Sequence, residues 1–95
     1  MTLTLNKNTY NLLKKIDWFE LNGQISLNDE QMTVNIPERV LFPFESGEEE
    51  MDGIEALGIV INENIVVYGM ENQDTYTEYG KDLSMLYDWL MSLDY

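Results

Sequence analysis

The chain has 95 residues, of which eighteen are acidic and five are basic, so its formal charge at pH 7 is −13. It contains no cysteine and no histidine. These absences exclude disulfides, zinc–thiolate sites, thiol nucleophiles and imidazole bases. So negative a charge also opposes direct binding to nucleic acid or to an anionic membrane, and it favours a basic partner.

The composition predicts a single acidic domain over residues 1–95. Apolar residues make up 44% of the chain and aromatic residues 12%, which is typical of a folded core and not of a disordered acidic tail. The apolar runs are far shorter than the ~20 residues that span a bilayer, and no signal-peptide pattern follows Met1. We therefore expect a soluble, cytoplasmic protein.

The first third of the chain predicts a strand, a helix and a hairpin. Met1–Leu5 alternates Thr and Leu, which suits a short edge strand or a lead into the helix. From about Asn8 to Asn22 apolar residues recur at helical spacing. Asn6 or Asn8 can cap this helix, and Gly23 lies just past its end. Residues 24–27 and 32–36 are β-prone runs on either side of a polar turn, so they predict a hairpin.

The middle of the chain predicts a second hairpin beside an acidic loop. Residues 39–44, RVLFPF, are bulky and kept extended by Pro43. Residues 45–55 favour a loop or a single helical turn. Residues 56–70, ALGIVINENIVVYGM, contain two β-branched runs around Asn62-Glu63-Asn64, which predicts a central hairpin with cover on both faces.

The last third predicts a C-terminal helix over residues 82–93, with its leucines on one face. Residues 75–79 fit either a strand or an early start of that helix. The fold class that we expect is α+β, with an antiparallel sheet of four or five strands, an N-terminal helix and a C-terminal helix.

Catalysis and metal binding find little support in the sequence. The serines have no imidazole to activate them, and no nucleophile–base arrangement is visible, so we do not expect an enzyme or a cofactor. Glu48, Glu50 and Asp52 match the first ligand positions of a calcium loop. Ile59, however, stands where calcium needs a bidentate acid, so we expect no dedicated metal site.

The acidic residues are the candidate functional residues. A run of acids is usually a solvated face, but solubility needs a net charge of only about two to eight in a small domain. We therefore expect a negative surface that binds a partner. Same-face carboxylates on a strand lie ~6.6 Å apart, close to two steps of ~3.4 Å along one DNA strand, so they can stand in for phosphates. The candidate acids are the dense patch at 45–55 and those across the predicted central hairpin: Glu45, Glu48, Glu49, Glu50, Asp52, Glu55, Glu71, Asp74, Glu78 and Asp82.

Two apolar features predict self-association. The predicted central hairpin has two apolar faces, and Met85 and Trp89 lie off the main apolar face of the last helix. A two-fold interface between two copies would cover them. The alternative is a monomer in which each helix covers one face of the sheet.

In size, in acidity, in its lack of Cys and His and in its α+β pattern, the chain resembles the small acidic DNA-mimic inhibitors of bacteriophages. These block uracil-DNA glycosylase, restriction enzymes, CRISPR effectors or nucleoid proteins. Within this class, the chain most resembles the phage-encoded inhibitors of the bacterial histone-like HU protein. It implies an inhibitor that covers the DNA-binding surface of a basic host protein in the bacterial cytoplasm; HU is itself a basic dimer, which a paired negative surface would suit. An HU-like partner is favoured, with a nuclease, a glycosylase or a CRISPR effector as other partners.

The resemblance carries no shared residue motif, so the candidate acids rest on charge and spacing alone. Two alternative functions stay open. One is an immunity protein against a cationic nuclease toxin, and the other is an acidic phage accessory or structural protein.

Overall fold

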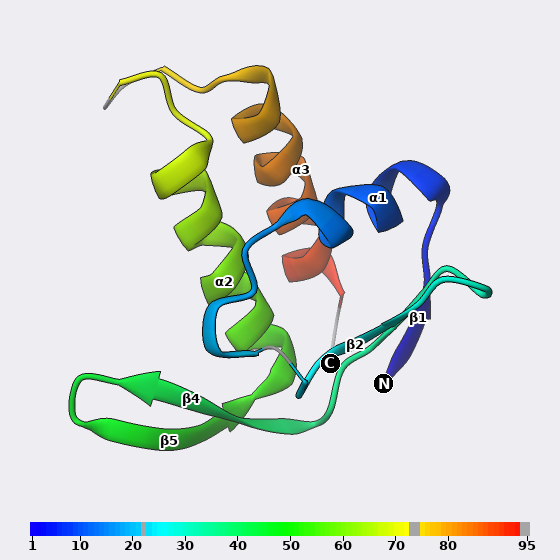
Figure 1. Ribbon diagram of the computed structural model, residues 1–95, viewed down its shortest axis with the longest axis vertical. Helices are drawn as coiled ribbons and strands as arrows, with labels where there is room; N and C mark the ends of the chain where they lie inside the picture. Colours follow the sequence, from blue (N-terminus) through cyan, green and yellow to red (C-terminus); the bar gives the residue numbers. More distant parts are fainter. Residues whose placement is uncertain (22, 73–74, 94–95) are drawn as a thin grey trace.

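The computed structural model describes residues 1–21, 23–72 and 75–93. It confirms the α+β class, with five antiparallel strands, a helix near the N-terminus and a helix near the C-terminus (Figure 1). The strands form two separate sheets, one of three strands and one of two, instead of a single sheet. The elements in chain order are β1 Thr2–Thr4, α1 Lys7–Lys15, the 3-10 turn η1 Phe19–Leu21, β2 Ser26–Asn28, β3 Thr33–Asn35, β4 Arg39–Phe44, β5 Gly47–Asp52, α2 Gly53–Tyr68 and α3 Glu78–Ser92.

The three-stranded sheet has the order β1-β3-β2, and both pairings are antiparallel. β1 is an edge strand, as its alternating Thr and Leu predict. β2 and β3 form the predicted hairpin. At its centre Val34 pairs with Leu3 on one side and with Leu27 on the other, and its side chain is fully buried.

Helix α1 begins at the predicted cap but ends seven residues before the predicted end at Asn22. The Asn6 side chain accepts a hydrogen bond from the Thr9 N–H at 2.8 Å. The chain turns extended at Ile16 because the next residue, Asp17, is held through its backbone by Asn64 of α2. A tertiary contact therefore ends this helix where the local pattern would allow it to continue.

The predicted central hairpin at residues 56–70 is wrong. Residues 53–68 form a continuous helix, α2, and the turn expected at Asn62-Glu63-Asn64 lies inside it. The buried residues Leu57, Ile61 and Ile65 follow one another at helical spacing and make one face of α2 apolar. Because packing of that face outweighs the modest helix penalty of β-branched residues, tertiary structure overrides the local β preference.

The start of α2 is fixed by a cap inside the stretch that we expected to be a loop. The Asp52 carboxylate accepts hydrogen bonds from the N–H groups of Ile54 and Glu55 at 2.9 and 3.1 Å. Asp52 and Glu55 have the spacing of a capping box. Residues 45 and 46 of that stretch form the turn, and residues 47–52 are strand: β5 pairs with β4 from Gly47–Phe44 to Asp52–Arg39.

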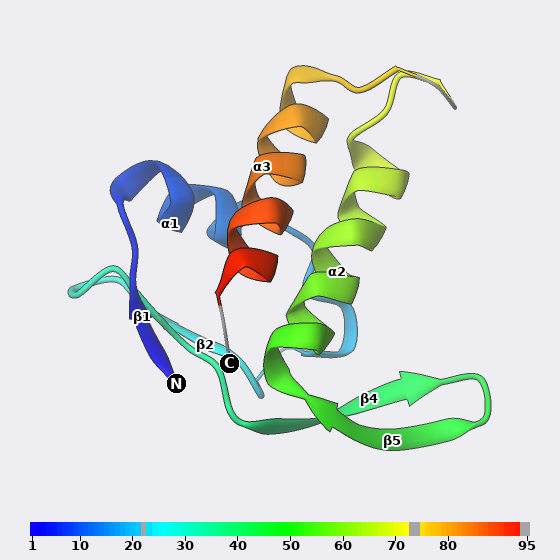
Figure 2. The same cartoon turned by 180° about the vertical axis from the view of Figure 1, so that it is seen from behind.

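Helix α3 begins at Glu78, one turn earlier than residue 82, so residues 78 and 79 of the ambiguous stretch are helical. Tyr76, in the same stretch, instead forms an isolated antiparallel bridge with Met70. Thr77 is its N-cap and accepts a hydrogen bond from the Gly80 N–H at 3.0 Å. Figures 1 and 2 show α3 returning antiparallel beside α2. The two helices approach closely near the segment that joins them. A Cβ placed on Gly80 would lie only 1.8 Å from the Gly69 carbonyl oxygen.

One hydrophobic core joins these elements. Its fully buried side chains come from every layer: Leu13 from α1, Leu21 from η1, Val34 from β3, Leu57 and Ile61 from α2, and Leu83 and Leu90 from α3. The β4–β5 hairpin joins this core mainly through Val40, and the remainder of it extends away from the helices as an arm (Figure 1).

Candidate functional site

The densest group of candidate acids lies on the β4–β5 hairpin. Glu45 is in the turn, and Glu48, Glu49 and Glu50 follow one another on β5; all four side chains are exposed. Because side chains alternate along a strand, Glu48 and Glu50 share one face and Glu49 points to the other. An antiparallel strand rises ~3.4 Å per residue, so the two same-face carboxylates are spaced by ~6.8 Å along β5.

The partner strand supplies no charge to neutralise these glutamates. Glu48 lies opposite Pro43, Glu49 opposite Phe42, and Glu50 opposite Leu41. Within the described part of the chain, none of the three glutamates forms an ion pair. We name Glu48, Glu49 and Glu50 together the hairpin glutamates. They form a line of uncompensated negative charge on a projecting two-stranded ribbon.

Contacts along β4 hold the hairpin in place. The Gln24 side chain pairs with β4 like a short strand: its amide NH₂ donates to the Leu41 carbonyl at 2.9 Å and its oxygen accepts from the Leu41 N–H at 2.8 Å. Phe42 and Phe44 pack on one face with ring centroids 5.0 Å apart. The glutamates take part in none of these contacts, so their charge can be changed without removing a support of the arm.

Asp52 and Glu55 continue the acidic surface from the hairpin onto α2, but only Glu55 is free to serve a partner. Glu55 is exposed in the first turn of the helix. Asp52 is half-buried, and its carboxylate caps α2 through two backbone hydrogen bonds. We therefore assign Asp52 a structural role in addition to its charge.

The expectation that Glu71, Asp74 and Glu78 face the acidic patch across a central hairpin is wrong for the residues that the structure describes. Glu71 and Glu78 lie beyond the C-terminal end of α2, whereas the hairpin joins its N-terminal end. A 16-residue helix is ~24 Å long, so the two groups are well separated. Asp74 lies outside the described residues. Glu78 and Asp82 share α3 at i,i+4 spacing, and Glu78 pairs with Lys81 at 3.5 Å. The candidate acids that the structure describes thus form two groups, one towards each end of α2.

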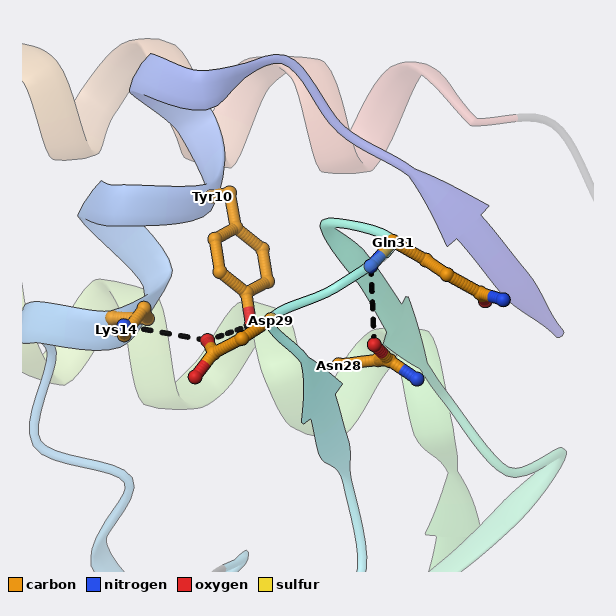
Figure 3. A network of polar contacts seen from close by, with 5 residues as sticks. All are labelled: Tyr10, Lys14, Asn28, Asp29 and Gln31. Atoms are coloured by element: carbon orange, nitrogen blue, oxygen red, sulfur yellow. Dashed lines mark hydrogen bonds and ion pairs between the residues drawn. The ribbon is translucent and has the colours of Figure 1, made fainter.

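One acid outside the candidate set is neutralised by its neighbours. Asp29 accepts a hydrogen bond from the buried Tyr10 hydroxyl at 2.5 Å and pairs with the Lys14 ammonium at 3.3 Å (Figure 3). The Tyr10 hydrogen bond, followed by Lys14, lowers the pKa of Asp29. Burial, followed by the same hydrogen bond, raises the pKa of Tyr10 to about 12. This triad joins α1 to the β2–β3 turn, in contrast to the unpaired hairpin glutamates.

Two hollows lie away from the hairpin, and sequence reasoning missed one of them. The larger, about 520 Å³, is a groove between α1 and α3 with Leu12, Lys15, Asp82, Met85 and Trp89 in its lining. The predicted Met85 and Trp89 stripe therefore exists, and it forms one wall of a groove. The smaller hollow, about 360 Å³, lies between Lys15 and Tyr79 over the buried Asn64. In the sequence Asn64 does not differ in kind from its exposed neighbours Asn62 and Glu63, so no pattern there indicated this hollow.

In the described part of the chain, no three acidic side chains converge where a metal ion could be held. None of the helices there combines the length and the hydropathy that a bilayer-crossing segment requires. Comparison with family models, with curated proteins and with solved structures found no match to this chain. The charge and geometry of the hairpin are therefore the features from which a function can be inferred.

Proposed function

We propose that this protein is a non-catalytic inhibitor that mimics DNA and occupies the DNA-binding surface of a basic protein in the bacterial cytoplasm. The observation that carries the proposal is the line of hairpin glutamates: three consecutive, exposed carboxylates without ion-pair partners on an arm that extends from the body. Self-repulsion of unpaired charges costs stability. Their concentration on one arm is therefore better explained by a basic partner than by folding.

The spacing of the glutamates supports the choice of DNA as the mimicked ligand. The ~6.8 Å between Glu48 and Glu50 along β5 matches two steps of ~3.4 Å along the axis of one DNA strand. Lysine and arginine side chains that bind a row of phosphates along one strand can therefore bind these carboxylates instead. Glu45 in the turn and Glu55 on α2 prolong the same negative surface at its two ends.

The favoured partner is an HU-like nucleoid protein, on the strength of the resemblance to acidic phage inhibitors. A nuclease, a glycosylase or a CRISPR effector offers a similar cationic surface, and such proteins bind DNA largely through phosphate contacts. For any of these partners, mimicry requires that this protein competes with DNA for the partner and does not bind DNA itself.

The test is displacement of a labelled DNA duplex from purified HU, titrated with this protein at a low and a moderate salt concentration. We expect displacement that weakens as salt rises. Replacing all three hairpin glutamates by lysine (E48K/E49K/E50K) should weaken displacement by a few kcal/mol, because like charges then face each other. Circular dichroism checks that the variant is folded.

The matched control changes the same amount of charge elsewhere. Glu30, Glu63 and Asp88 are exposed and lie outside the hairpin, so E30K/E63K/D88K alters net charge as much as the hairpin variant does. We expect it to weaken displacement much less. Equal losses in the two variants would refute the hairpin as the contact. If the wild-type protein displaces DNA from neither HU nor a panel of a nuclease, a glycosylase and a CRISPR effector, the mimicry proposal fails.

A further inference from the structure

The groove between α1 and α3 presents apolar side chains to solvent. Met85 is 65% exposed, the highest value among the large apolar residues of the described chain. Leu12 and Trp89 are half-buried beside it, one from each helix. Together these three residues form the apolar floor of the groove. Exposed apolar surface gathered in a concave site and rimmed by charge is typical of a protein–protein contact.

The two walls of the groove carry opposite charges. Residues 1–16 contain three lysines and no acid, whereas all eighteen acids lie in residues 17–95. Lys15 of α1 and Asp82 of α3 both line the groove and are both exposed. Neither forms an ion pair within the described part of the chain, although Lys14 does, with Asp29. The groove thus holds an unpaired cation and an unpaired anion.

We propose that the occupant of this groove is a second copy of the chain, bound about a two-fold axis. In a two-fold interface residue i meets residue j of the partner, and j meets i. Lys15 then pairs with the partner's Asp82, and Asp82 pairs with the partner's Lys15. Met85 of each copy packs against Leu12 and Trp89 of the other.

Charge favours this occupant over a different protein. A strongly basic partner is repelled by the α1 wall and attracted to the acids elsewhere on the surface. A second copy brings an acid to Lys15 and a base to Asp82 at once. The contact also uses α1, which carries lysines and no acid in a chain whose charge is −13, so two copies approach where their mutual repulsion is weak.

The interface leaves the candidate functional site open. The groove lies between α1 and α3, whereas the β4–β5 hairpin extends from the N-terminal end of α2 (Figures 1 and 2). The dimer therefore does not depend on the DNA-mimic proposal, and either proposal can fail without the other.

The first test measures molar mass by sedimentation velocity and light scattering over a range of concentrations. It is done in about 150 mM NaCl, where the Debye length is about 8 Å and long-range repulsion is screened. We expect the mass to rise from 11.1 kDa towards twice that value as concentration increases. Met85→Glu should weaken the dimer at least about tenfold, since it places a charge in the apolar floor.

Val66→Glu is the matched control, because Val66 is 59% exposed on α2 and lies outside the groove. It should dimerise like the wild type. The proposal is overturned if the wild-type protein stays monomeric at the highest concentration, which leaves the groove to another occupant. It is equally overturned if Val66→Glu breaks the dimer while Met85→Glu does not.

The second test exchanges the two charges. Lys15→Glu and Asp82→Lys should each weaken the dimer at least about tenfold, because each sets like charges against each other twice per interface. The double variant K15E/D82K should recover most of the wild-type association, which a folding defect cannot do. If both single variants dimerise weakly and the double variant dimerises no better, the pairing of Lys15 with Asp82 is overturned.

Discussion

The side chain of Asn64, fully buried in α2, forms two hydrogen bonds with the backbone of Asp17. The Asp17 N–H donates to Asn64 Oδ1 and the Asn64 Nδ2 donates to the Asp17 carbonyl, each at 2.8 Å. The same Nδ2 also donates to the Val60 carbonyl at 2.8 Å. The Asn64 side-chain amide therefore satisfies the backbone N–H and carbonyl of the residue that follows the end of α1, and it fixes where that helix ends.

We expect Asn64→Ala to lower the free energy of unfolding by about 2–4 kcal/mol, because it leaves backbone groups of Asp17 without partners and opens a small cavity. Asn62→Ala is the control, since Asn62 is an exposed asparagine on the same helix. It should stay within about 0.5 kcal/mol of the wild type. Urea unfolding followed by circular dichroism measures both, and equal stability of the two variants would refute the role of Asn64.

A second prediction about stability follows from the contact between Gly69 and Gly80. A Cβ on Gly80 would lie 1.8 Å from the Gly69 carbonyl oxygen, which is backbone and cannot swing aside. Gly80→Ala should therefore cost about 3 kcal/mol or more by separating α2 from α3. At Gly58 the nearest atom is the flexible Met91 methyl, at 2.8 Å. Because alanine also favours a helix by up to ~1 kcal/mol, Gly58→Ala should be close to neutral. Thermal melting distinguishes the two, and similar losses would contradict this reading.

The elements fixed by local signals were predictable from the sequence. α1 has its Asn6 cap and helical spacing, and the β2–β3 hairpin has a polar turn between β-prone runs. α2 was missed because Ile59–Ile61 and Ile65–Val67 have strong local β preference. The one local signal for a helix was the capping pair Asp52 and Glu55, which is easily lost within a run of acids.

The candidate site was predictable in composition but not in arrangement. Acidity alone identified the patch at residues 45–55, yet the strand β5 that aligns the hairpin glutamates contains few β-forming residues. Its structure comes from pairing with β4, whose own residues, RVLFPF, are strongly β-prone. The placement of Glu71 and Glu78 depended on the misassigned α2, so the error in one element moved them to the wrong end of the molecule.

The Tyr10–Asp29 hydrogen bond should give a pH-dependent contribution to stability. The pKa of Asp29 is lower in the folded protein than its usual 3.8, so folding favours the charged carboxylate. The resulting stability is present above the unfolded pKa and is lost as pH falls through the folded pKa. We expect Tyr10→Phe to be less stable than the wild type near pH 7, and the difference to shrink below about pH 4.

NMR titration of the Asp29 side chain provides the direct measurement for this pair. Tyr10→Phe should raise the pKa of Asp29, since the Tyr10 hydroxyl is the largest cause of its lowering. Lys14→Ala should raise it as well, through loss of the second partner. An unchanged Asp29 pKa in Tyr10→Phe would show that the hydrogen bond does not act on this carboxylate.

Stability should increase with moderate salt. Most acids in the described part of the chain form no ion pair. Screening therefore relieves their mutual repulsion as the Debye length falls from about 30 Å at 0.01 M to about 10 Å at 0.1 M. We expect the melting temperature to rise by several degrees over this range. E30K/E63K/D88K, with its lower negative charge, should show a smaller rise. A melting temperature that is flat or falls with salt would mean that the acids do not repel one another appreciably.

Association kinetics separate long-range attraction from contact at the hairpin, and this prediction depends on the proposed function. Steering by the overall field depends on net charge, which E48K/E49K/E50K and E30K/E63K/D88K change equally. Both variants should therefore bind a basic partner more slowly than the wild type, and the difference should fade as salt rises. Only the hairpin variant places lysines against the partner's cations in the bound state, so only its dissociation should accelerate.

Both rate constants can be measured at two salt concentrations, by binding to a surface-immobilised partner and by stopped-flow mixing. Equal dissociation rates for the two variants would place the contact on another part of the acidic surface.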